Sequence, residues 1–192
     1  GHNGREETTT LCLIPAVRAV TTLPLIAAGG IATGEAMLAA RVLGAEGVQI
    51  GTRFALTAES SANEVFKDYC LHLEEGDTRL LLKKLAPVRL VRNNFRSAVE
   101  AAEAVGASEE ELRILLGRGR AKRGIFEGDL EEGELEIGQV SACCMERECS
   151  LWRRSCKSWW RRAEGRGREC RNWISEYSLF WYHITIKKEY SR

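Results

Sequence analysis

Long apolar runs are missing from this 192-residue sequence, and no stretch approaches the roughly 20 apolar residues that a membrane-spanning helix needs. A surplus of charge of one sign is missing too, because 28 Lys and Arg stand against 27 Asp and Glu. This balance predicts neither nucleic acid nor an anionic membrane as a partner. The sequence also lacks an initiator Met and a basic-then-apolar leader, so we expect a cytoplasmic protein whose sequence starts inside a longer chain.

Trp is absent from the first 142 residues, whereas residues 143–192 hold all five Trp and five of the seven Cys. The same tail carries twelve basic and six acidic residues, against 16 and 21 in the rest of the chain. Four interpretations of this tail are open: a nucleic-acid-binding arm, a Cys-based metal site, a genuine extension of the chain, or translation in a wrong reading frame. The Cys residues form no CxxC pair, so we predict no metal. We favour the frameshift and leave residues 143–192 unassigned.

The first 61 residues alternate between strand and helix patterns. The apolar run 23–28 predicts a buried parallel strand that ends at Gly29 and Gly30. A helix with a face of small residues follows and ends at Gly44, before a second strand over residues 47–52. Repeats of this kind are typical of an α/β fold. Upstream, residues 10–20 predict a helix that has Pro15 near its first turn.

Beyond Phe54 the pattern favours helices. We expect helices over residues 60–73 and 97–105, and an extended segment over residues 85–91. Ser108 and Glu111 form a capping box that opens a third helix. The buried face of that helix is predicted to consist of Leu112, Leu115 and Leu116.

Two glycine-containing turns follow the two predicted strands. Gly29 and Gly30 come after the first strand, and Gln49, Gly51 and Thr52 end the second. Carboxyl ends of consecutive parallel strands are neighbours in an α/β barrel, and glycines let backbone N–H groups approach a phosphate closely. These residues therefore predict phosphate binding, with a pair of ordinary tight turns as the alternative.

His2 lies between glycines in a polar loop and has no apolar neighbours to bury it. An exposed loop residue is one interpretation, and an acid, base or substrate-orienting donor is the other, because imidazole titrates near neutral pH. His72 lies on a predicted surface helix, and we expect it to be exposed without a function.

These segments, taken together in order, closely resemble the nitronate monooxygenase (2-nitropropane dioxygenase) family, which includes FMN-dependent enoyl-acyl-carrier-protein reductases. The resemblance rests on residues 1–4 (GHNG), 25–34 (LIAAGGIATG), 43–54 (LGAEGVQIGTRF), 87–95 and 128–142, and it stops at about residue 142. The family usually carries an apolar or basic residue where this chain has Asn3.

The resemblance implies the carboxyl-terminal part of an FMN-binding TIM (β/α)8 barrel in the α/β class. Residues 1–61 would be its last strands, residues 62–142 a mostly helical, lid-like segment of the same domain, and residues 143–192 the unassigned tail. The catalytic histidine of the family maps onto His2. The loops that hold the FMN phosphate map onto Gly29, Gly30, Gln49, Gly51 and Thr52.

Three functional hypotheses follow. In the first, which we favour, the parent enzyme uses FMN and O2 to oxidise alkyl nitronates. In the second, it uses NAD(P)H and FMN to reduce an enoyl thioester. In the third, this chain is an inactive fragment that binds FMN poorly and aggregates, because two parallel strands leave unpaired edges. The expected partners are a small-molecule substrate and a second copy of the chain in a homodimer.

Overall fold

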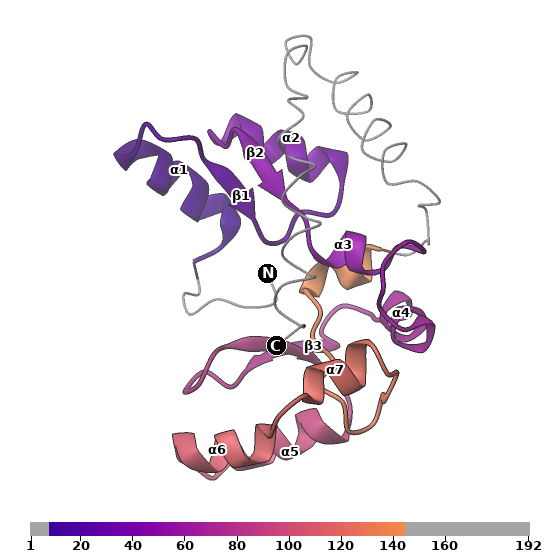
Figure 1. The fold of residues 1–192 in the computed structure, drawn as a ribbon. Coiled ribbons are helices and arrows are strands. Elements are labelled where there is room, and N and C mark those ends of the chain that lie inside the picture. The colour runs from indigo at the N-terminus through magenta and orange to yellow at the C-terminus, as the bar shows by residue number, and fades with distance from the viewer. Residues whose placement is uncertain (1–7, 145–192) are drawn as a thin grey trace.

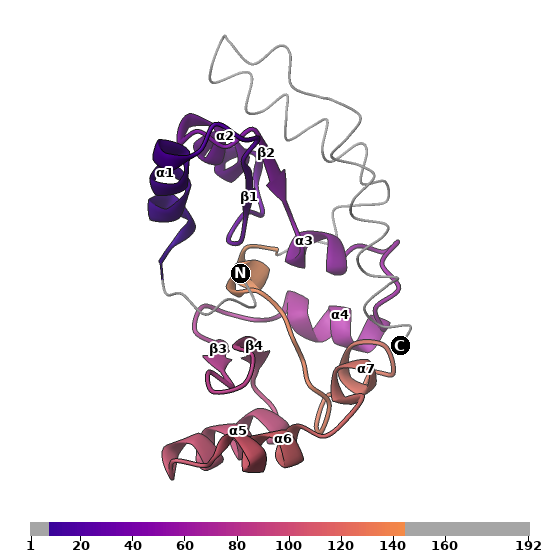
Figure 2. The same cartoon turned by 60° about the vertical axis from the view of Figure 1, so that its left-hand side comes forward.

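The computed structural model describes residues 8–144, which form two groups of elements joined by a narrower middle (Figures 1 and 2). One group contains α1, β1, α2 and β2, and the other contains β3, β4, α5, α6 and α7. The helices α3 and α4 lie between the groups together with the 3-10 helix η1. No helix within residues 8–144 is long and apolar enough to cross a membrane.

The first group is a strand–helix–strand unit with one additional helix. It consists of α1 (Thr10–Val20), β1 (Ile26–Ala28), α2 (Gly34–Val42) and β2 (Gly47–Gln49). The two strands pair in parallel, and α2 is the crossover between them. Thr33 caps α2 through its side chain, which accepts a hydrogen bond from the Ala36 N–H. The core of this group is Ile14, Ala27, Ile31, Ala40, Ala45 and Ile50.

Most expectations for this group are confirmed, and three are wrong in detail. The second strand was expected over residues 47–52, but β2 ends at Gln49, and Thr52 is already the first residue of the helix α3. The predicted helix 10–20 is α1, but Pro15 lies in the second turn of α1 rather than near the first. The predicted buried strand is only partly buried, since Ala27 is buried while Ile26 is 57% exposed. The reason is that successive side chains of a strand point to opposite faces, so Ala27 faces the core of this group while Ile26 and Ala28 share the other, exposed face. The α/β character is therefore present as one parallel pair of strands.

The second group is built around an antiparallel hairpin. Its strands are β3 (Thr78–Leu81) and β4 (Val88–Val91), which pair from Thr78 with Val91 to Leu81 with Val88. The helices α5 (Asn94–Ala104), α6 (Glu109–Leu116) and α7 (Arg120–Ile125) follow. The hairpin, α5 and α6 share a core of Leu81, Leu82, Val88, Leu90, Phe95, Val99 and Leu112.

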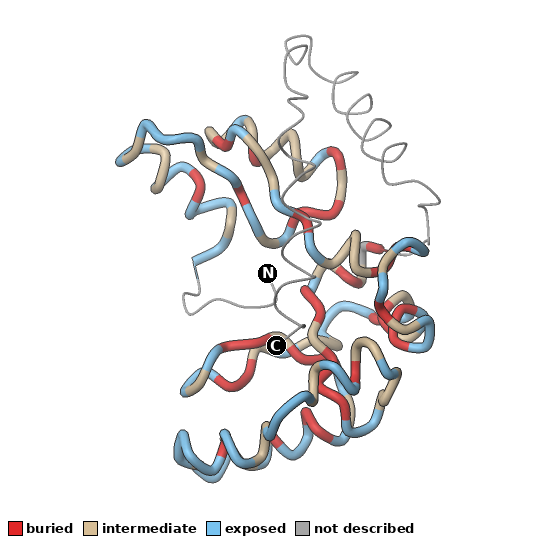
Figure 3. Tube along the Cα trace, viewed as in Figure 1, coloured by how far each residue is buried: buried red, intermediate tan, exposed pale blue. Residues whose placement is uncertain are grey.

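The sequence predicted this group in part. The capping box of Ser108 and Glu111 is present at the start of α6, and the expected extended segment contains β4. Leu112 is buried as expected, whereas Leu115 and Leu116 are half-buried against the same core. The outer faces of α1 and α6 are largely exposed (Figure 3). Neither β3 nor α7 was predicted, because β3 lacks alternation and α7 is rich in Arg and Lys.

The middle of the molecule brings distant segments together. It contains α3 (Thr52–Ala55), α4 (Glu64–Leu71) and η1 (Gln139–Cys143). The chain from 134 to 138 runs along β4: the Val91 N–H donates to Leu135 O at 3.0 Å, and the Ile137 N–H donates to Arg89 O at 3.3 Å. The same chain then continues to η1 beside α3 and α4 (Figure 2). A separate cluster, which includes Leu56, Phe66, Leu135, Ile137 and Cys144, forms the core there.

Candidate functional site

The two predicted glycine turns lie at the same edge of the parallel strand pair. In the β1–β2 register, Ala28 is the partner of Gln49. Gly29 directly follows the first of these residues, and Gly51 follows the second after one buried residue, Ile50. The structure therefore brings together the two loops that the sequence analysis singled out, at the carboxyl ends of neighbouring strands.

The loop after β1 has a backbone that only glycine adopts easily. Gly29 has φ 96° and Gly30 has φ 74°, in the left-handed region that side chains disfavour. The Thr10 hydroxyl at the start of α1 donates a hydrogen bond of 2.8 Å to the Gly29 carbonyl, which fixes the loop against α1. A Cβ placed on Gly30 would meet no other heavy atom within 4 Å in the described part of the chain. The space above Gly30 is thus open for the backbone to approach a ligand.

The loop after β2 leads directly into α3. The Gly51 carbonyl accepts hydrogen bonds from the Phe54 N–H at 3.0 Å and the Ala55 N–H at 2.9 Å. A Cβ on Gly51 would also have no neighbour within 4 Å among residues 8–144, and Gln49 is exposed. Thr52 is the first residue of α3, so its N–H has no acceptor inside the helix. The side chain of Thr52 is half-buried.

One contact of this loop was not predicted from the sequence. The Gly138 N–H donates a hydrogen bond of 3.0 Å to Thr52 Oγ1 from a position 86 residues further along the chain. The residues around Gly138 belong to the family resemblance, but neither periodicity nor spacing connects them to Thr52. A contact at this sequence separation depends on how the chain returns past β4.

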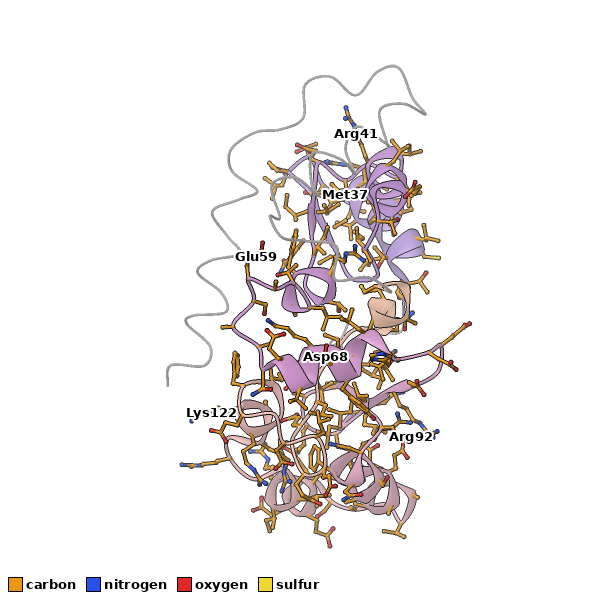
Figure 4. All side chains as sticks on the ribbon, turned by 90° about the vertical axis from the view of Figure 1, so that its right-hand side faces the viewer. Met37, Arg41, Glu59, Asp68, Arg92 and Lys122 are labelled. Atoms are coloured by element: carbon orange, nitrogen blue, oxygen red, sulfur yellow. The ribbon has the colours of Figure 1, made fainter. Side chains whose placement is uncertain are left out.

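His72 lies away from this edge of the strand pair, and His2 lies outside the described residues. His2 lies outside residues 8–144, so its assignment stays a prediction. His72 is exposed at the end of α4, with Nδ1 2.7 Å from the Asp68 carbonyl oxygen, as the sequence led us to expect. In Figure 4, Asp68 lies between Met37 and Arg41 of α2 at one end and Lys122 of α7 at the other. His72 thus belongs to the middle of the molecule.

The ionisable groups with strongly shifted pKa values lie away from the two glycine loops. Burial, together with a smaller effect of the nearby Cys144, raises the pKa of the Cys70 thiol to about 12. Burial also raises the pKa of the Glu134 carboxyl to about 7, against the opposing effect of Arg120. Neither group lies in the glycine loops. Within residues 8–144, no three His, Cys, Asp or Glu side chains are grouped so as to hold a metal ion.

Comparison with known proteins assigns the family. The family model described as nitronate monooxygenase matches residues 1–151. The chain belongs to the nitronate monooxygenase family. Over 87 residues it is 42% identical to a probable nitronate monooxygenase from Staphylococcus haemolyticus strain JCSC1435, covering 41% of this chain and 24% of that protein. Over 69 residues it is 46% identical to a probable nitronate monooxygenase from Staphylococcus aureus strain JH9, covering 36% and 19% of the two proteins.

Two solved structures of related proteins are similar in fold. FabK from Thermotoga maritima is 33% identical with a TM-score of 0.72, over 88% of this chain and 53% of that one. Nitroalkane oxidase from Streptomyces ansochromogenes is 28% identical with a TM-score of 0.62, over 82% and 45%. The chain therefore spans about half the length of these solved structures and about a fifth to a quarter of the curated relatives.

Proposed function

We propose that the full-length protein is an FMN-dependent nitronate monooxygenase that oxidises alkyl nitronates with O2. The family of the chain supports the class of activity. The observation that carries the assignment of the site is the pairing of Ala28 with Gln49, which sets the two glycine loops side by side at one edge. Ligands of α/β barrels bind at this edge, often with a phosphate after the last two strands.

The residues of the two loops fit a phosphate group. The backbone at Gly30 and Gly51 is not screened by a side chain, and a Cβ at either position would point into open space within the described region. Thr52 adds a hydroxyl group, which can donate one hydrogen bond and accept two. The Gly29 carbonyl accepts the hydrogen bond from Thr10 that fixes the first loop against α1. The exposed Gln49 offers a side-chain amide, which can both donate and accept hydrogen bonds.

When bound, FMN supplies the electron-accepting chemistry of the proposed oxidation. The resemblance assigns a complementary role to His2, which would orient the nitronate, or form it by taking the proton from the carbon next to the nitro group of a neutral nitroalkane. Imidazole is suited to this task because it changes its protonation state near neutral pH. The two glycine loops would hold the phosphate end of the cofactor, and His2 would act at the reacting end.

A second candidate function is the reduction of an enoyl thioester with NAD(P)H. The likeness of the chain to FabK from Thermotoga maritima, with a TM-score of 0.72, favours this candidate. The similarity to a nitroalkane oxidase, with a TM-score of 0.62, favours the first. Both candidates use the same phosphate loops, so the choice depends on the substrate.

The deciding experiment uses the FMN-loaded, full-length protein in two assays. Consumption of propyl-2-nitronate and O2 is measured in one, and oxidation of NADH with crotonyl-CoA as acceptor in the other. We expect turnover of the nitronate and none of the crotonyl thioester. The reverse result would replace the first function by the second. A protein that binds no FMN would contradict both.

A further inference from the structure

The hydrogen bond from Gly138 to Thr52 joins a distant segment to the proposed phosphate loop. The donor is the backbone N–H of Gly138, the acceptor is Thr52 Oγ1, and the two atoms are 3.0 Å apart. Thr52 contributes the only hydroxyl among the five residues that the sequence analysis assigned to the phosphate. Whatever fixes this hydroxyl also fixes the direction in which it can donate.

The segment that carries the Gly138 N–H is held on both sides. Before it, the chain is bound to β4 through the hydrogen bond from the Ile137 N–H to Arg89 O, and Ile137 is buried. After it, η1 packs against both α3 and α4. Cys144, at the end of η1, is buried in the same cluster as Leu56, which directly follows α3. Gly138 is itself buried, so its N–H is anchored in the core and not on a mobile surface loop.

We propose that Gly138 is a positioning residue for the phosphate site, acting through Thr52. A hydroxyl has one proton, and this proton cannot point at a group that is already donating to the oxygen. Because the Gly138 N–H occupies a lone pair of Thr52 Oγ1, the Thr52 proton is directed away from Gly138 and is left for an acceptor such as a phosphate oxygen. The chain from 134 to 144 thereby couples the hairpin group to cofactor binding. This inference rests on the proposed function.

A matched pair of substitutions at Gly138 separates the N–H from the rest of the residue. Gly138 has φ −74° and ψ 153°, a conformation that proline and alanine both adopt. Gly138→Pro removes the N–H, whereas Gly138→Ala keeps it and adds a comparable side-chain carbon. Thr52→Val removes the hydroxyl at the other end of the same bond, and the double variant Thr52→Val/Gly138→Pro tests whether the two changes act through one contact.

The readout is the dissociation constant for FMN and for riboflavin, which lacks the phosphate, measured by flavin fluorescence with the full-length protein. We expect Gly138→Pro and Thr52→Val each to weaken FMN binding by about 5- to 10-fold, a factor typical of one hydrogen bond. Riboflavin binding should be unchanged in both variants, and Gly138→Ala, which keeps the N–H, should keep the preference for FMN over riboflavin. In the double variant, the loss should not exceed that of Thr52→Val alone.

A second measurement does not need proline at position 138. Hydrogen exchange of the Gly138 amide is followed in the unsubstituted protein and in Thr52→Val, where loss of the acceptor should accelerate exchange. Unaltered exchange would overturn the inference, and so would equal losses of FMN and riboflavin in Gly138→Pro, since these would indicate a purely structural role. If Thr52→Val loses the preference for FMN and Gly138→Pro keeps it, the inference fails and the phosphate site stands. If the unsubstituted protein shows no preference for FMN over riboflavin, the proposed phosphate site fails, and the inference with it.

Discussion

Gly124 and Gly133 lie backbone against backbone, where α7 meets the chain that returns toward β4. A Cβ built on Gly133 would lie 2.3 Å from the Gly124 Cα and 2.3 Å from the Asp129 carbonyl oxygen. Neither neighbour is the end of a flexible side chain that could move aside. The contact depends on the absence of a side chain at Gly133, and a Cβ on Gly124 would likewise lie 2.8 Å from the Glu134 carbonyl oxygen in the segment that leads to Gly138.

We therefore expect Gly133→Ala to be strongly destabilising. Forcing a methyl group into packed backbone costs about 1–3 kcal/mol in the free energy of unfolding, and this site has little room to relax. Urea unfolding monitored by circular dichroism measures the loss. The control is Gly51→Ala, where the added carbon has no neighbour within 4 Å in the described region and φ is −95°. Equal unfolding free energies for the two variants would contradict the importance of the glycine contact.

Asn93 supports the same returning chain from the start of α5. Its Nδ2 donates to Gly133 O at 2.7 Å and to Leu130 O at 3.1 Å, while its Oδ1 accepts from the Arg96 N–H at 2.8 Å. Asn93→Ala removes all three interactions. Since a lost cap costs about 1 kcal/mol and an unpaired carbonyl adds to it, we expect a loss of about 2–3 kcal/mol in the free energy of unfolding.

Asn63 provides the matched control for Asn93. It caps α4 by accepting from the Val65 N–H at 2.9 Å, and its Nδ2 has only a long contact of 3.5 Å to Phe126 O. Asn63→Ala should therefore cost little more than the cap itself, about 1 kcal/mol. If thermal or urea unfolding shows Asn93→Ala to be no more costly than Asn63→Ala, the two carbonyl contacts do not stabilise the returning chain.

Local patterns predicted the elements that depend on local interactions. The helix α1, the cap at Ser108 and the two loops at the edge of β1 and β2 follow from periodicity, capping and strand–helix alternation. The elements that were missed depend on partners far along the chain. Strand β3 is defined by its pairing with β4, and the Gly138 to Thr52 bond spans 86 residues. No local signal in the sequence specifies such a contact, because it forms only when the middle of the molecule is assembled.

Lys67 illustrates the same limit, since a helix pattern gives no sign that its ammonium group is buried. The side chain is 1% exposed, and Nζ donates to Ser60 O at 2.7 Å, to Glu64 Oε1 at 2.9 Å and to Ala58 O at 3.4 Å. Lys67→Met keeps most of the volume and leaves the Ser60 and Ala58 carbonyls without this donor. We expect a loss of about 2 kcal/mol in the free energy of unfolding, with faster hydrogen exchange in residues 57–62.

The control for Lys67 is Lys122, which lies on α7 with its side chain 65% exposed and Nζ 3.0 Å from Glu127 Oε1. An exposed ion pair contributes little, so Lys122→Met should change the free energy of unfolding by less than about 1 kcal/mol. Comparable losses for both methionine variants, measured in the same urea titration, would mean that the three hydrogen bonds of the Lys67 ammonium group do not hold the chain before α4 in place.

Glu134 should give the stability of the protein a specific dependence on pH. Burial raises the pKa of its carboxyl from an ordinary value of 4.5 to about 7, although Arg120 acts in the opposite direction. Between these two values the unfolded chain loses the proton while the folded chain keeps it. Folding is therefore penalised as the pH rises from about 4.5 to about 7, and stability falls over this range before it levels off. At 1.36 kcal/mol for each pKa unit, the fall attributable to Glu134 is at most about 3 kcal/mol.

Glu134→Gln removes the ionisable group and keeps nearly the same shape. The variant should match the unsubstituted protein near pH 4 and exceed its free energy of unfolding by as much as about 3 kcal/mol at pH 8, where the buried carboxylate would otherwise be charged. Urea unfolding at intervals from pH 4 to pH 8 measures both curves. The control is Glu131→Gln, at an exposed position of the same loop. It removes a negative charge from the surface and leaves the buried Glu134 carboxyl in place, so the free energy of unfolding should still fall as the pH rises. If the curves of Glu134→Gln and the unsubstituted protein run parallel, Glu134 is ionised in the folded protein across this pH range. Arg120 would then compensate the cost of burying the Glu134 carboxylate.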